Sequence, residues 1–199
     1  MKRLVFVALL SLIASFALAQ GSTFVSAGLA LPQKPEEFST QWGVGLSLAG
    51  GIEAPVNEWF ALVAGFDLTT FPLKEDKYIE AQGVAGTGVS VSGGSTGILT
   101  LTAGARATVA YAPKVLSVYV LGLFGYMNYS RKDLEVSQSG YAGTLAGEEK
   151  SSVCVGTGIG FETKVSKIMD GFIEGRYVVD LGAGNRAFIP IRAGIRIKL

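Results

Sequence analysis

The residues of this chain that could do chemistry are acidic and basic side chains spaced two apart within apolar segments. Glu174 and Arg176 flank a single glycine, and Arg192, Arg196 and Lys198 alternate with apolar residues near the C-terminus. A carboxylate beside a guanidinium could serve general acid–base catalysis, but the same pairing is the usual form of a buried structural ion pair. We interpret Glu174 and Arg176 as members of structural ion pairs.

Composition excludes several classes of catalytic and metal site. The chain has no histidine, which excludes Ser-His-Asp and Cys-His nucleophilic sites and imidazole ligation of a metal. Its single cysteine, Cys154, lies among glycines and cannot form an internal disulfide. The G-x-G spacings are not followed by a helical pattern, so they do not indicate phosphate-binding loops. The sequence therefore predicts no catalytic residue, no cofactor, no metal and no enzymatic activity.

The segment 187–199, which holds three of these charges, must position them on one face. Isoleucines, Ala193 and Leu199 occupy one parity, and Pro190, Arg192, Gly194, Arg196 and Lys198 occupy the other. Successive side chains of a β-strand point to opposite faces, so this alternation predicts a strand with an apolar face and a cationic face.

The same alternation predicts eight strands after residue 20, at 22–30, 41–53, 59–69, 98–111, 116–129, 151–163, 171–181 and 187–199. Short turns at 54–58, 112–115 and 164–170 alternate with longer segments at 31–40, 70–97 and 130–150, which we expect to be polar loops at the other end. Residues 78–92 could form an extra strand, but we interpret them as an external extension of a hairpin. A ten-stranded barrel that also recruits part of 130–150 is the structural alternative.

The alternation also predicts a protein with its apolar residues on the outside and its polar residues on the inside. The predicted outer faces are rich in Leu, Ile, Val and Phe, whereas the inner faces carry Gly, Thr and charge. An arginine facing lipid near the bilayer midplane costs about 2–4 kcal/mol, so the mid-strand arginines must point inward. An eight-stranded barrel is just wide enough for side chains to fill. We therefore predict a lumen filled by ion pairs among Glu53, Asp67, Arg106, Glu162, Glu174, Arg176, Asp180, Arg192, Arg196 and Lys198.

Two further expectations concern the outer surface. The segment 116–129 has no charge to fix its faces, and we expect Tyr119, Leu121 and Leu123 to point outward with Asn128 inward. Amphipathic rings favour membrane interfaces. The aromatic residues that we expect at the two interfaces are Trp42, Trp59, Phe60, Tyr111, Phe161 and Phe188.

The N-terminus indicates export. Lys2 and Arg3 precede an apolar run that ends at Ala17-Leu18-Ala19, which is the pattern of a secretory signal peptide over residues 1–19 with cleavage before Gln20. Mean hydropathy is high at +0.41, yet after residue 20 no apolar run approaches the roughly 18 residues that a spanning helix needs. The near-neutral charge of +1 gives no reason to expect nucleic acid as a partner.

These patterns resemble the small eight-stranded outer-membrane β-barrels of the OmpA-transmembrane-domain and OmpX-like family. The resemblance rests on the signal peptide, V-C-V-G-T-G-I-G-F-E, E-G-R-Y and the terminal I-P-I-R-A-G-I-R-I-K-L. It implies an all-β, antiparallel, up-and-down transmembrane barrel over residues 20–199, located in the bacterial cell outer membrane and surrounded by its lipid. It also implies that the barrel-assembly machinery reads the strand 187–199, although this family usually ends in an aromatic residue and this chain ends in Leu199.

The function we expect is non-enzymatic: a structural role, or binding and adhesion through an extracellular partner that contacts loops 70–97 and 130–150. One alternative is a small pore-forming or transport barrel. Another is a soluble lipocalin-like barrel that binds a ligand in an apolar interior.

Overall fold

The computed structural model describes residues 21–199 except 113–115, 139–140 and 183. The predicted signal peptide and its cleavage site lie outside the described residues.

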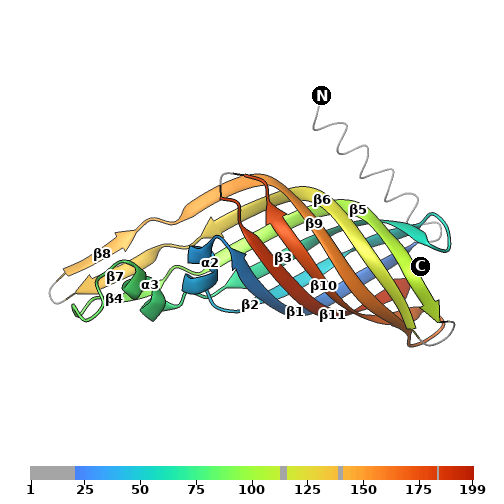
Figure 1. Ribbon diagram of the computed structural model, residues 1–199, viewed down its shortest axis with the longest axis horizontal. Coiled ribbons are helices and arrows are strands. Elements are labelled where there is room, and N and C mark those ends of the chain that lie inside the picture. Colours follow the sequence, from blue (N-terminus) through green and yellow to red (C-terminus); the bar gives the residue numbers. More distant parts are fainter. Residues whose placement is uncertain (1–20, 113–115, 139–140, 183) are drawn as a thin grey trace, which may run out of the picture.

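Within the described residues, eight antiparallel strands close into a barrel in the order β1-β11-β10-β9-β6-β5-β3-β2 (Figure 1). The first and last strands pair from Ser22↔Lys198 to Pro32↔Phe188, so no strand of the ring has an unpaired edge. This architecture confirms the predicted fold, and the ten-stranded alternative is wrong. The strands are β1 Ser22–Lys34, β2 Gly45–Pro55, β3 Phe60–Phe71, β5 Thr96–Ala112, β6 Leu116–Arg131, β9 Glu148–Lys164, β10 Met169–Asp180 and β11 Ala187–Lys198.

The outer surface of the barrel is apolar and its interior contains the charges. On β11, Ile191 is 48% exposed whereas Arg192 is 1% exposed. On β5, Leu101 is 44% exposed and Arg106 is 8% exposed. In water such a surface would be costly, while in a bilayer it meets hydrocarbon, and the closed ring lets each strand hydrogen-bond to a neighbour on both sides.

One end of the barrel carries structure that the sequence patterns did not predict. Helix α2 (Glu36–Gln41) follows β1, and helix α3 (Glu75–Ala81) follows β3 (Figure 1). Strands β4 (Ser90–Gly93), β7 (Leu134–Gln138) and β8 (Tyr141–Leu145) form a separate sheet in the order β4-β7-β8, here called the outer sheet.

The segments 31–40 and 130–150 were therefore wrongly predicted to be loops throughout. Of residues 78–92, interpreted as an external hairpin extension, only the end is a strand, β4, and it pairs with β7. Strands β6 and β9 stay paired as far as Arg131↔Glu148, well into the predicted loop 130–150. Beyond the membrane both faces of a strand meet water, so the side chains need not alternate and the period-2 signal disappears.

The expected register of β6 was also wrong. Tyr119, Leu121 and Leu123 are buried inside the barrel, whereas Phe124 is 61% exposed on the outside. Asn128 lies among the outward set, where its side-chain amide donates to Glu149 and Ser151. Within the predicted segment 116–129 both faces are largely apolar and neither carries a charge, so parity alone could not orient it.

Among the described residues, no helix combines the length and the apolar character that crossing a membrane would require.

Candidate functional site

A layer of four charged side chains crosses the middle of the barrel. Arg192 on β11 forms ion pairs with Asp67 on β3 and with Glu174 on β10, the latter with 3.4 Å between Nη2 and Oε1. Arg176 on β10 also pairs with both acids, 3.6 Å separating its Nη1 from Oδ2 of Asp67. All four side chains are buried, and β10 and β3 lie on opposite walls of the ring. These pairs therefore span the lumen.

A second layer lies nearer the short turns. Arg106 contacts Glu53 at 2.8 Å and Glu162 at 3.2 Å, and Arg196 pairs with the same two carboxylates. The ring of Tyr119 lies beneath both guanidinium groups, 4.5 Å from the Cζ of Arg106 and 5.8 Å from that of Arg196. Its hydroxyl donates to Glu174 over 3.1 Å, which connects the two layers.

The remaining predicted lumen residues lie at the ends of the barrel. Asp180 is 3.9 Å from Nη1 of Arg186, and Lys198 is 2.9 Å from Asp170. The Lys198 side chain is 48% exposed, so it lies at the rim and not in the lumen. Asp170 and Arg186 were absent from the predicted set. Asp170 shares the inward parity of Glu174 and Asp180, which could have identified it, but Arg186 lies in a connection without a strand pattern.

Little free space remains between the two charged layers. The cavity among Phe24, Glu53, Leu121, Phe172, Arg196 and their neighbours has a volume of about 10 Å³, roughly what a single water molecule needs. Buried charges are tolerated because each faces an opposite charge, which offsets part of its desolvation cost. The described lumen is thus packed with side chains at this level.

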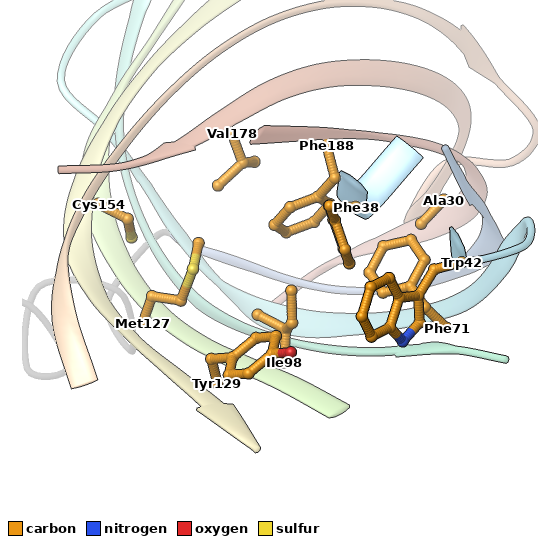
Figure 2. Close-up of a cluster of buried hydrophobic side chains, with 10 residues drawn as sticks. All are labelled: Ala30, Phe38, Trp42, Phe71, Ile98, Met127, Tyr129, Cys154, Val178 and Phe188. Atoms are coloured by element: carbon orange, nitrogen blue, oxygen red, sulfur yellow. The ribbon is translucent and has the colours of Figure 1, made fainter. Parts of the chain in front are cut away.

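Above the charged layers, the mouth of the barrel is filled by an apolar cluster (Figure 2). Phe38 of α2 contacts Phe71 with 5.1 Å between ring centroids, and Phe71 contacts Phe188 at 5.7 Å. Helix α2 thus inserts a ring among side chains from opposite walls. The cluster, here called the mouth cluster, comprises Ala30, Phe38, Trp42, Phe71, Ile98, Met127, Tyr129, Cys154, Val178 and Phe188.

The mouth cluster corrects two of the expected interface aromatics. Trp42 is 7% exposed and Phe188 is 1% exposed, so both belong to the interior. Phe188 has the inward parity of Arg192, and Trp42 follows α2 and precedes the regular alternation of β2. Trp59, Phe60 and Phe161 are about half exposed near the short turns, as a lipid-facing ring requires. The side chain of Tyr111 lies outside the described residues.

A pocket of about 550 Å³, here called the mouth pocket, lies above the mouth cluster. Aromatic rings, two arginines and two amides line it, together with the carboxylates of Glu37 and Glu148. The neighbouring ammonium of Lys150, and more weakly Arg186 and Arg131, lower the pKa of Glu148, so this carboxylate is charged at neutral pH. The lining residues are Pro35, Glu37, Phe38, Gln41, Trp42, Tyr78, Ala81, Gln82, Tyr129, Arg131, Glu148 and Arg186.

No family model matches the sequence, and no curated protein matches it significantly. Similar solved structures include Neisserial surface protein A (NspA), with a TM-score of 0.60 at 14% identity over 90% of this chain and 97% of that one. Ail, the attachment invasion locus protein of Yersinia pestis, gives a TM-score of 0.53 at 12% identity over 90% and 98%. A major outer membrane protein of Thermus thermophilus gives 0.50 at 13% identity over 90% and 99%.

This chain has the fold of the small eight-stranded outer-membrane β-barrels.

The barrel has its short turns and its C-terminus at one end, and the two helices and the outer sheet at the other (Figure 1). In outer-membrane barrels the short turns are periplasmic and the longer connections extracellular. The mouth cluster, the mouth pocket and the outer sheet are therefore on the external side. No group of His, Cys, Asp and Glu side chains suited to a metal ion is found in the part of the chain that the structure describes.

Proposed function

We propose that this outer-membrane barrel has a non-enzymatic binding or adhesion role and that its external end carries it. The observation that supports the proposal best is a division of the molecule into two parts. The transmembrane interior is packed with ion pairs and aromatic rings, whereas the two longest connections build a separate sheet outside the ring.

The outer sheet is suited to contact with a partner. Its strands pair from Ser90↔Ser137 to Gly93↔Leu134 and from Leu134↔Leu145 to Gln138↔Tyr141. Val91 and Leu134 are buried within it, while Ser92, Glu135 and Ser137 are exposed. Exposed hydroxyl groups with few charges can make hydrogen bonds to a partner at modest desolvation cost.

A pore is the less favoured role because the lumen is obstructed at two levels. The cross-barrel pairs of Arg192 and Arg176 occupy its centre, and Phe38 and Phe188 occupy its mouth. A soluble lipocalin-like carrier would need the opposite arrangement, with a large apolar interior and a polar outside. We keep two expectations as part of this proposal: a signal peptide over 1–19, and recognition of the strand 187–199 by the barrel-assembly machinery.

Surface display tests the proposal. Cells of a Gram-negative host that express the full chain should adhere to immobilised matrix proteins or cultured epithelial cells more than vector controls do. A variant with a short Gly-Ser link in place of 134–145 should lose this adhesion. A Lys77→Ala/Glu80→Ala variant, which changes only an exposed ion pair on α3, should keep it.

Heat-modifiable migration on gels would verify that each variant is a folded barrel. Adhesion that survives removal of the hairpin, or discrete conductance steps of the intact protein in planar bilayers, would contradict the proposed role.

A further inference from the structure

Three side-chain donors on residues that line the mouth pocket make no hydrogen bond within the described protein, and one of them has only a long ion pair. Nε1 of Trp42, Nε of Arg131 and Nη1 of Arg186 are buried without a hydrogen-bond partner among the described residues. Trp42 as a whole is 7% exposed, so water does not easily replace a partner. Buried polar groups are nearly always hydrogen-bonded in folded proteins, and three unsatisfied donors around one cavity indicate a missing acceptor.

Two of the three donors belong to the guanidinium groups of Arg131 and Arg186, so the acceptor that complements them is an anionic group. Arg186 is held in place by Tyr129, whose ring centroid is 3.8 Å from its Cζ, and its ion pair with Asp180 is long at 3.9 Å. Arg131 ends strand β6 at the same level. Of the two lining acids, Glu148 already pairs with Lys150. Arginines with free N–H groups recognise carboxylates through charge-assisted hydrogen bonds.

The rest of the lining fits a ring with polar edges. Tyr78 offers a partly exposed ring beside the nearly buried rings of Phe38 and Trp42, and Gln41 and Gln82 contribute amides that both donate and accept. A volume of about 550 Å³ is in the range of small-molecule sites. A sugar ring presents an apolar face for stacking and hydroxyl groups at its edge, so it can contact both the aromatic and the amide side chains of the lining.

We propose that the mouth pocket binds an acidic monosaccharide unit, with its carboxylate at Arg131 and Arg186 and its ring against Tyr78. This site goes beyond the proposed adhesion role, because its walls come from α2, α3, β6, β9 and the link before β11 and not from the β7–β8 hairpin.

The chain supplies its own reporter for the test. It has two tryptophans, Trp42 in the pocket wall and Trp59 near the short turns. In a Trp59→Phe background, the fluorescence of the full-length barrel in detergent micelles reports on Trp42 alone. Titration with D-glucuronate should change it saturably in the millimolar range or below. D-glucose should bind at least about tenfold more weakly, because it cannot use the charge-assisted bonds.

Arg131→Gln and Arg186→Gln should each weaken glucuronate binding about tenfold or more. Lys132→Gln is the matched control, since it removes an exposed neighbouring cation that does not line the pocket. Heat-modifiable migration would check that all variants are folded. Wild-type affinity in both arginine variants, or no saturable response to glucuronate, would overturn the proposal.

Benzoate separates the two parts of the inference. Binding of benzoate as tight as that of glucuronate would overturn the assignment to a sugar. Equal binding of glucose and glucuronate would overturn the role of the carboxylate. Adhesion of the hairpin-deleted variant addresses the proposed function separately, so the failure of one proposal is distinguishable from the failure of the other.

Discussion

At the scale of single residues, the barrel depends on charged side chains that are buried in its interior, where an unpaired charge has a high desolvation cost. Arg192 has no exposed side-chain surface and faces both Asp67 and Glu174. Removing one partner from such a group leaves the others uncompensated, which is more damaging than the absence of the whole set. The glycines opposite bulky side chains are a second residue-scale device, because they provide the space that the rings occupy.

Arg192→Met should lower the free energy of unfolding by about 3–5 kcal/mol, since Asp67 and Glu174 would lose a buried counter-charge. Reversible unfolding by guanidinium in lipid vesicles measures the change. Lys77→Met, which removes an exposed cation whose partner Glu80 is also exposed, should have a small effect. Equal midpoints for the two variants would contradict this account of the lumen.

Gly160→Ala should destabilise the barrel by about 1–3 kcal/mol through overpacking. A Cβ at this position would lie 2.2 Å from Cζ of Tyr119, the ring that supports Arg106 and Arg196. Gly175→Ala on the neighbouring strand is the control, because nothing lies within 4 Å of the added atom. The same vesicle unfolding assay compares them, and similar losses of stability would show that the Tyr119 contact is unimportant.

At the scale of elements, β6 shows where sequence patterns stop being informative. On β11, β10 and β9 the charges mark the inner face, and the outward residues Ile191, Ile173 and Ile159 follow from parity. On β6 the inner face consists of Tyr119, Leu121, Leu123 and Met127, which are as apolar as the lipid-facing residues. Their apolar character is required by contacts across the lumen, and no local pattern contains those contacts.

Phe124→Arg should impair membrane insertion, because it places a charge on the lipid face of β6 at a cost of about 2–4 kcal/mol. Phe124→Leu keeps an apolar side chain there and should insert normally. Assembly can be followed as the fraction of heat-modifiable protein after dilution from urea into vesicles. Wild-type assembly of the arginine variant would instead place Phe124 inside and restore the register first expected.

The helices are a second element that the sequence patterns did not predict. Helix α2 spans Glu36–Gln41 and has no side-chain hydrogen bond at its N-cap, so its local signals are weak. It is held by the burial of Phe38 against Trp42 and in one cluster with Phe71 and Phe188, the last two of which are distant in sequence. The mouth pocket was missed for the same reason, since its lining comes from five separate segments.

At the scale of the whole molecule, closure of the ring was predictable and the shape of its external end was not. The terminal strand and the even number of alternating segments predict that β1 meets β11, and the pairing Ala27↔Ala193 lies at the middle of that contact. The external end lies in water, where a strand no longer has one face toward lipid and the other toward the lumen. Its sequence therefore need not alternate, and the pattern does not predict its structure.

Ala27→Cys/Ala193→Cys should cross-link in a Cys154→Ala background when the folded barrel is treated with a short bifunctional thiol reagent. The two residues are register partners and both point outward. The cross-linked chain should migrate anomalously even after boiling, because it remains a closed loop. Ala27→Cys/Ile173→Cys, which joins strands that are not neighbours in the ring, should not cross-link.

The cross-barrel pairs have a consequence for how the protein enters the membrane. Asp67 on β3 meets Arg176 on β10 across three intervening strands on either side of the ring, and Glu53 on β2 meets Arg106 on β5 across β3. Both acids belong to the β2–β3 hairpin, and their cationic partners lie on other strands. If that hairpin entered the bilayer alone, the carboxylates of Glu53 and Asp67 would enter the hydrocarbon without a counter-charge. Its two strands must therefore reach full depth together with the strands that carry the arginines.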